Sequence, residues 1–339
     1  MKFAKIRMAT AFAAALTLTA PAAMAEELSF ATFLPHNHET ITGMYAWFEK
    51  EVEERSGGTL SLALYPAGQL GAGPTQQYKR AIEGVADITI GLAASTPTLF
   101  PRTLLATLPG RAIDGEDATR RIWSVYDEHM ADEWSDVKLL ALGTAAGRML
   151  IANRDLSTVE GMQGAKIVPF AAMTTPVVQG MGMVPVQMPP EEHYTALSTG
   201  TIDGAVSSIN NLLPPWNLDE VANYAIMNTP PSFLVIFVVM NKERYESLSP
   251  EHQQVLNDIA GLPLSVELSR SFDKHDEFAL GWIDEQIEAG ELRVEWIITS
   301  DEERAKMEDV IANSLDEIYA EYAANGIDNA REIYEALNQ

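Results

Sequence analysis

Through the first ninety residues, apolar positions alternate between strand-like and helical spacing in a regular order. Residues 28–33 alternate and stop at a proline, and residues 41–52 then place their apolar side chains at helical spacing. A second alternating run covers residues 60–64, a second helix is expected near residues 74–84, and a third strand at 87–90. This strand–helix–strand–helix–strand order predicts a parallel sheet with right-handed crossovers.

A comparable alternation recurs between residues 137 and 206, so the sequence predicts two α/β lobes. Residues 233–240 (FLVIFVVM) are apolar without interruption, as expected for a strand covered on both faces of its sheet. A helical pattern follows Pro263 and meets no breaker before Gly290. A last amphipathic helix around residues 307–318 is expected to pack on the outside.

The N-terminus has the pattern of a secretory signal peptide. Lys2, Lys5 and Arg7 precede a short apolar run, and the small residues around Ala25 suit a cleavage site. We therefore expect residues 1–25 to be removed and the mature chain to be exported to the periplasm.

Composition and charge narrow the classes of function. Apolar residues make up 47% and charged residues 21% of the 339 residues, as in ordinary globular proteins, and cysteine is absent. Without the three basic residues of the signal peptide, 20 Lys and Arg face 48 Asp and Glu, a formal charge of −28. Such a charge argues against nucleic acid as a partner. Because the acidic residues are spread over helices, solvated helix faces explain them better than an acidic docking patch.

Several motifs in order resemble the solute-binding proteins of TRAP transporters, the DctP-like family. They are SGG at 56–58, YPAGQLG at 65–71, GVADI at 84–88, and the stretch from Gly164 to Asn211 with its MPP, YTAL and GTIDG segments. One position departs from the family pattern: Val168 stands where members usually carry an arginine that holds the carboxylate of the ligand.

The resemblance implies a two-lobed periplasmic binding protein fold of the α/β class, each lobe a mostly parallel sheet flanked by helices, with crossing strands. Lobe I is expected from residues 26–145 and about 230–265, and lobe II from 146–229 and about 285–320. A helix at about 265–290 would span both lobes. The implied partners are a small organic solute and the integral membrane subunits of a TRAP transporter. We expect no cofactor, no nucleic acid and a monomeric protein.

Ligands of open α/β sheets lie beyond the carboxyl ends of the strands, so four strand-end loops are candidates for the cleft. The first contains His36 and Asn37, which are expected either to contact the ligand or to cap the next helix, a metal site being the least favoured alternative. The second contains Leu92. The third contains Arg148, which by position matches a second carboxylate-binding arginine of some family members, or else forms a structural ion pair.

The fourth wall would combine residues that follow two strands of lobe II: Val168, Phe170, Ser207, Asn210, Asn211 and Trp216. The aromatic members could equally belong to the core. Valine at position 168 removes about two charge-assisted hydrogen bonds, each of about 1.5–3 kcal/mol. The ligand is then either an acid held by Arg148 and nearby polar groups, which we favour, or a small amine such as ethanolamine held by aromatic and acidic side chains.

Other classes of function are less well supported by the sequence. It contains no G-x-S-x-G or G-x-G-x-x-G motif, and Glu191 and Glu192 beside His193 suit the start of a helix better than acid–base catalysis. An enzyme is therefore not expected. A sensory ligand-binding protein of the same fold stays an alternative to transport.

Overall fold

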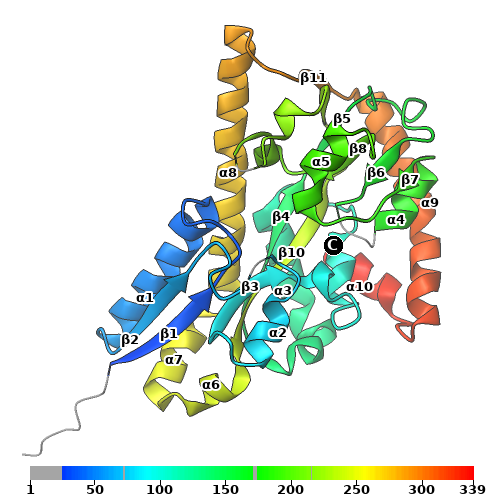
Figure 1. Cartoon of the computed structure of the whole chain (residues 1–339). Coiled ribbons are helices and arrows are strands. Elements are labelled where there is room, and N and C mark those ends of the chain that lie inside the picture. The colour runs from blue at the N-terminus through cyan, green and yellow to red at the C-terminus, as the bar shows by residue number, and fades with distance from the viewer. Residues whose placement is uncertain (1–24, 72, 171–173, 215) are drawn as a thin grey trace, which may run out of the picture.

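The computed structural model describes residues 25–71, 73–170, 174–214 and 216–339, and shows two sheets, one in each lobe (Figure 1). The predicted signal peptide lies outside these residues except for Ala25. Lobe I holds a five-stranded sheet in the order β2-β1-β3-β10-β4. Its strands, in chain order, are β1 (Glu26–Ala31), β2 (Leu60–Tyr65), β3 (Ile88–Leu92), β4 (Val137–Gly147) and β10 (Ser232–Asn241).

Lobe II holds a six-stranded sheet in the order β11-β9-β5-β8-β6-β7. Its strands are β5 (Met149–Ala152), β6 (Lys166–Val168), β7 (Val184–Pro185), β8 (Gly204–Ser207), β9 (Tyr224–Met227) and β11 (Glu295–Ile298). The alternation of strands and helices that the sequence predicts between residues 137 and 206 is confirmed, with α4 (Thr175–Gly180) and α5 (His193–Ser198) between the strands.

Each sheet is parallel except for one strand, and that strand is the one that arrives from the other lobe. β10 pairs antiparallel with both β3 and β4 in lobe I, and β5 pairs antiparallel with both β8 and β9 in lobe II. Consequently the other strands of each sheet, which run parallel to one another, direct their carboxyl ends toward the boundary between the lobes. The predicted α/β class, with a mostly parallel sheet in each lobe and crossing strands, is confirmed.

The helices of lobe I cover its sheet on both faces. A π-helical turn, η1 (Ile41–Tyr45), leads into α1 (Ala46–Ser56), which ends at Gly57 in the left-handed conformation. The other helices on this side are α2 (Gln77–Ile82), α3 (Gly115–His129), α6 (Lys242–Ser247) and α7 (Pro250–Ile259). Short 3₁₀ turns occur in both lobes. Those of lobe I are η2 (Ala93–Ser95), η3 (Thr103–Thr107) and η4 (Ala131–Trp134), and those of lobe II are η6 (Pro190–Glu192), η7 (Ile209–Leu212) and η8 (Leu218–Glu220).

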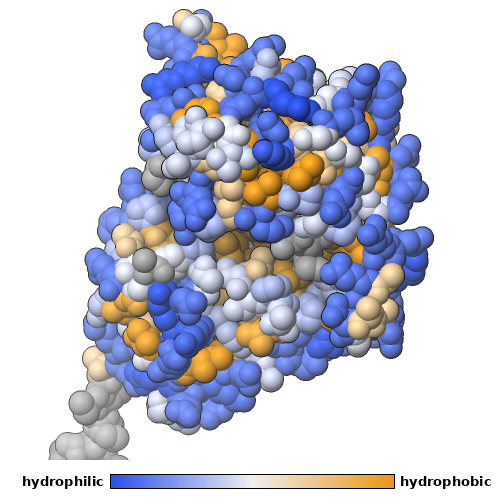
Figure 2. All heavy atoms as spheres, turned by 45° about the vertical axis from the view of Figure 1, so that its right-hand side comes forward, coloured by the Kyte–Doolittle hydropathy of each residue, from blue (hydrophilic) through white to orange (hydrophobic). Residues whose placement is uncertain are grey.

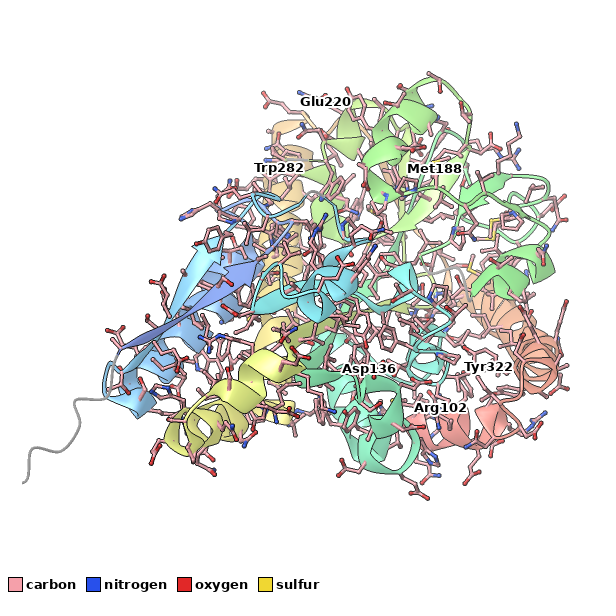
Figure 3. The ribbon with its side chains drawn as sticks, turned by 60° about the horizontal axis from the view of Figure 1, so that its bottom comes forward. Arg102, Asp136, Met188, Glu220, Trp282 and Tyr322 are labelled. Atoms are coloured by element: carbon pink, nitrogen blue, oxygen red, sulfur yellow. The ribbon has the colours of Figure 1, made fainter. Side chains whose placement is uncertain are left out.

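The long helix predicted after Pro263 is α8 (Leu262–Ala289), and it runs alongside both lobes (Figure 1). Pro263 occupies the first turn, where its missing N–H costs nothing, and the helix ends at Gly290 with φ of 71°, a conformation that favours glycine. Figure 3 shows Trp282 of α8 on the same side of the molecule as Glu220 and Met188 of lobe II, while Arg102 and Asp136 lie with lobe I.

Two further helices complete the chain. α9 (Asp301–Ala324) packs against α4 in lobe II through Met307 and Ile311, and α10 (Ala330–Leu337) packs against α3 in lobe I. The chain therefore returns to lobe I at its end. The expectation that the helix around residues 307–318 packs on the outside agrees with its place at the edge of lobe II (Figure 1). Among the described residues, no helix is long and apolar enough to span a bilayer.

Hydroxyl groups fasten the first half of α8 to lobe I. The Thr144 N–H of β4 donates to Ser269 Oγ at 2.9 Å and to Thr119 Oγ1 at 3.0 Å, and the two hydroxyls lie 2.6 Å apart. All three side chains are fully buried. The second half of α8 instead packs in the lobe II core, where Ala279 and Ile283 are buried. One rigid helix thus connects both lobes along one side of the boundary.

We expect Ser269→Ala to lower the free energy of unfolding by about 1–2 kcal/mol, because it removes buried hydrogen bonds to Thr119 and Thr144. The matched control is Ser124→Ala, whose hydroxyl is exposed and bonds only within α3. Urea unfolding of the three proteins measures the difference. Equal losses in both variants would contradict this role for the hydroxyl cluster.

Candidate functional site

The candidate site lies between the lobes, where the carboxyl ends of strands from both sheets meet. The loops after β1 and β3 approach from lobe I, and those after β6 and β8 approach from lobe II. Figure 2 shows the surface hollowed between the two halves of the molecule, with apolar side chains in the hollow. The predicted position of the binding cleft, beyond the strand ends of both lobes, agrees with this arrangement.

Arg148 is the single residue between β4 of lobe I and β5 of lobe II. The return crossing, between β9 and β10, runs beside it: the Thr229 hydroxyl donates to the Arg148 carbonyl at 3.3 Å. The neighbouring Gly147 makes room for an aromatic ring, because a Cβ at this position would lie 2.7 Å from Phe170 Cδ1. The backbone at this crossing between the lobes is therefore held in place, and it sets the position from which the Arg148 side chain extends.

The Arg148 side chain reaches toward α8 and is one-third exposed. Its Nη2 lies 3.8 Å from Asp273 Oδ1, which is a long ion pair. Among the described residues, its buried Nε–H has no hydrogen-bond partner. A guanidinium group is a rigid fork of donors, so this unused N–H is a candidate donor to a ligand acceptor.

Asp273 already has a structural task. Its two carboxylate oxygens accept the N–H groups of Gly115 and Glu116, at 3.1 and 3.0 Å, at the start of α3. Burial raises its pKa, and these backbone donors together with Arg148 partly oppose that rise. The carboxylate thus joins α8 to α3 and is only partly free to neutralise Arg148.

Asp276, one turn further along α8, is more deeply buried, with 7% of its surface exposed. Burial raises its pKa to about 7, although the positive charge of Arg148 and the backbone N–H of Asn210 both lower it. Its Oδ1 has no hydrogen-bond partner among the described residues. A buried polar atom without a partner is costly in a folded protein, so this oxygen is a candidate ligand contact.

A cavity of about 150 Å³ lies between the lobes, and its lining includes Asn210, whose backbone N–H reaches Asp276. Its walls come from the loop after β1, the η7 segment and α8, and consist of Pro35, Asn37, His38, Asn210, Pro214, Trp216 and His275. The rings of His38 and His275 lie 5.4 Å apart. Burial lowers the pKa of His38 to about 4, and the adjacent His275 lowers it further. Burial also lowers the pKa of His275, so both rings are neutral at pH 7.

The predicted site residues divide into three groups. Asn37, Asn210 and Trp216 line the cavity, and Arg148 and Phe170 lie at the hinge. In the second group, Asn211 of η7 donates from its Nδ2 to the hydroxyl of Ser207, the last residue of β8, at 2.9 Å. In the third group, Val168 is buried in the lobe II core, Leu92 packs on the lobe I core, and His36 is exposed. For all ten, contact with a ligand stays a prediction.

Three polar residues of the site were missed as ligand contacts by sequence reasoning: His38, His275 and Asp276. His38 lies in the first candidate loop, from which only His36 and Asn37 were named as candidates. His275 and Asp276 stand in α8 among the apolar residues Phe272, Phe278 and Trp282. The sequence signal that could have identified them is the presence of polar residues within a run of apolar positions on one helix.

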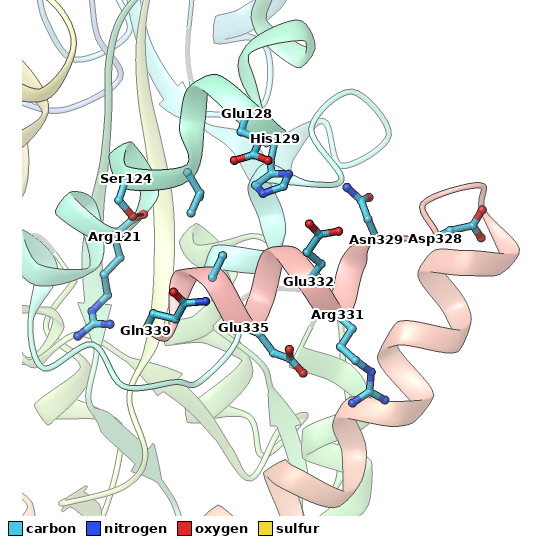
Figure 4. A pocket seen from close by; sticks show the side chains of 12 residues that line it. Arg121, Ser124, Glu128, His129, Asp328, Asn329, Arg331, Glu332, Glu335 and Gln339 are labelled. Carbon is cyan, nitrogen blue, oxygen red and sulfur yellow. Dashed lines mark hydrogen bonds between the residues drawn. The ribbon is translucent and has the colours of Figure 1, made fainter.

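Two other possibilities are not supported by the geometry. Among the described residues, no cluster of three or more acidic, histidine or cysteine side chains is arranged to hold a metal ion. A larger, open groove of about 900 Å³ lies on the outer side of lobe I between α3 and α10. Figure 4 shows Glu332 of α10 directed toward Glu128 and His129 of α3 there. This groove lies away from the strand ends and from the hinge.

The fold is that of a two-lobed protein with the strand ends of both sheets facing the boundary between the lobes. Residues 30–322 match the DctP family, described as bacterial extracellular solute-binding protein, family 7, and the chain belongs to this family. It is a family of periplasmic solute-binding proteins that work with the membrane components of TRAP transporters.

Relatives with stated ligands support this assignment. The 2,3-diketo-L-gulonate-binding periplasmic protein of Escherichia coli is 28% identical over 291 residues, 83% of each chain. A TRAP solute-binding protein from a marine metagenome, specific for aromatic acids and solved with 3-hydroxybenzoate, has 25% identity and a TM-score of 0.83, covering 93% of this chain and 97% of its own. The protein of Rhodoferax ferrireducens solved with benzoate has 25% identity and a TM-score of 0.82, covering 92% and 96%.

Burial of Asp276 has a consequence for stability that needs no ligand. Because its folded pKa is raised above the value of an exposed aspartate, its contribution is fully present at low pH and is lost as pH rises through about 7. We therefore compare the unfolding free energies of Asp276→Asn and the parent at pH 5 and at pH 8. The value for the variant minus that for the parent should be about 2–3 kcal/mol larger at pH 8 than at pH 5.

Urea unfolding at the two pH values measures this difference. Asp309→Asn, an exposed position on α9, is the control and should show no such change. If the stability difference between Asp276→Asn and the parent is the same at pH 5 and pH 8, the Asp276 carboxyl does not titrate in this range.

Proposed function

We propose that this protein captures a small organic acid in the periplasm and delivers it unchanged to the membrane subunits of a TRAP transporter. The observation that carries the acid class is Arg148. It lies at the crossing of the two lobes, its Nε–H has no partner among the described residues, and its nearest ion-pair contact is 3.8 Å away. A carboxylate in the cleft would supply the acceptor that this donor lacks.

The comparisons point to the same class of ligand. The relatives with stated ligands bind 2,3-diketo-L-gulonate, 3-hydroxybenzoate and benzoate, all of which carry one carboxylate. The cavity between the lobes combines Trp216 and the rings of His38 and His275 with the amide groups of Asn37 and Asn210. Such a lining suits a partly apolar acid with a few hydrogen-bonding groups.

The ten residues named from the sequence are proposed as the ligand site, with His38, His275 and Asp276 added. The lobe boundaries are proposed as predicted, with the hinge at Arg148 and at residues 228–231. Export by the N-terminal segment, a monomeric state and the absence of catalysis are part of the same proposal. They agree with a family of binding proteins that has small-molecule solutes.

The amine alternative is less well supported. The acidic pair on α8 could attract a cation, but Asp273 is engaged by two backbone N–H groups and burial raises the pKa of Asp276. None of the relatives described above has a cation as its stated ligand. A sensory role would use the same site. Genes for a small and a large membrane subunit beside this one would favour transport.

A thermal-shift screen tests the ligand class. Its panel should include benzoate, 3-hydroxybenzoate, lactate and gluconate, with ethanolamine and choline as cations. We expect at least one carboxylate to raise the melting temperature, since a ligand at one hundred times its Kd stabilises the folded state by about 2.7 kcal/mol. A response to the cations alone would contradict the proposal.

Arg148→Ala should abolish the shift produced by any carboxylate of the panel, because it removes the donor fork at the hinge. Arg55→Ala is the matched control, since Arg55 lies on α1 and, within the part of the chain that the structure describes, forms its ion pair with Glu51 of the same helix. The control should respond like the parent. An unchanged shift in Arg148→Ala would exclude the arginine from the site.

A further inference from the structure

Asp276 is one of two carboxyl groups near Arg148, so an anionic ligand bound there would add a third negative charge. Its carboxyl shares the surroundings of Arg148 with Asp273, one turn earlier on the same face of α8. A ligand carboxylate bound to Arg148 would be the third negative group around one positive charge. Such a group of like charges is stable only if one of the carboxyls takes up a proton.

The contacts decide which carboxyl takes that proton. Both oxygens of Asp273 accept backbone N–H groups at the start of α3, which favours its ionised form. Asp276 receives only the N–H of Asn210, is more deeply buried, and leaves Oδ1 without a partner among the described residues. The proton therefore belongs on Asp276 Oδ1, because the other oxygen accepts the Asn210 N–H.

The groups on neighbouring elements do not change this balance. From α3, Glu116 is paired with Arg120 and Arg270, and Asp114 caps its own helix. From the loop after β1, His38 lies against His275, and burial keeps both rings neutral near pH 7. From η7, the contribution is the uncharged N–H of Asn210. Arg148 is thus the cation that faces Asp276 from the hinge.

We propose that Asp276 binds the ligand as a neutral carboxylic acid, donating its Oδ1 proton in a hydrogen bond to the ligand carboxylate beside Arg148. Binding of the anion then takes up one proton from the solvent, with no covalent change in the ligand. The inference rests on the proposed function, since it requires an acid as ligand.

Proton uptake can be measured directly by calorimetry. We would titrate the parent with benzoate, 3-hydroxybenzoate, lactate and gluconate at pH 6, 7 and 8, in phosphate and in Tris, whose ionisation enthalpies differ. For any acid that binds, we expect close to one proton taken up at pH 8 and much less at pH 6. Above pH 8, the affinity should fall by about tenfold per pH unit.

Variants of Asp276 separate this role from a merely structural one. Asp276→Asn keeps an N–H donor but has no titrating group, so it should bind the same acid with little pH dependence and no proton uptake. Asp276→Leu has no donor and should bind at least tenfold more weakly at every pH. The exposed Asp309→Asn should behave like the parent.

The outcomes distinguish this inference from the proposed function. If an acid binds the parent without proton uptake and with equal affinity at pH 6 and pH 8, the neutral-donor role of Asp276 is wrong while the acid ligand stands. Equal affinity of Asp276→Leu and the parent for the acid would also show that the neutral-donor role is wrong. If none of the four acids binds and a cation does, the ligand class fails and this inference fails with it.

Discussion

The structure depends on one constraint: the chain must pass from lobe I to lobe II within a single residue, Arg148, between two strands. The strand entering each sheet from the other lobe runs against its neighbours, so the remaining strands all present their carboxyl ends to the same gap. Gly147 is required beside the crossing because the Phe170 ring occupies the space of a Cβ. The architecture therefore places the positive charge of Arg148 at the crossing between the two lobes.

The long helix α8 determines how that charge is used. Its first half is held to β4 by buried hydroxyls, and its second half belongs to the lobe II core. In between, it presents Asp273 and Asp276 to Arg148. One carboxylate serves the start of α3, whereas the other is buried with an unused oxygen. In a site that has valine at position 168, a protonatable carboxyl beside a single arginine is a physically reasonable way to hold an anion.

Much of the fold was predictable from the sequence, and less of the site. The unbroken apolar run of β10, the alternation around β1 and β2, and the breaker-free stretch from Pro263 to Gly290 are local signals, and they gave the correct elements. Asn37, Asn210 and Trp216, which line the cavity between the lobes, could be named as candidates because they lie in segments that follow strands. Asp276 and His275 were not named because their burial on α8 arises from contacts with segments distant in the sequence. A local sequence pattern contains no information on such contacts. The burial of Val168 and the exposure of His36 likewise depend on tertiary packing.

We propose that the two lobes close on an acid between Arg148 and α8. A crystal structure of the protein with the carboxylate that stabilises it most is the most direct test. We predict that the ligand carboxylate lies within hydrogen-bonding distance of both Arg148 Nε and Asp276 Oδ1, enclosed by both lobes. A ligand bound elsewhere, for example in the groove between α3 and α10, or lobes unchanged around an empty cleft, would contradict the account.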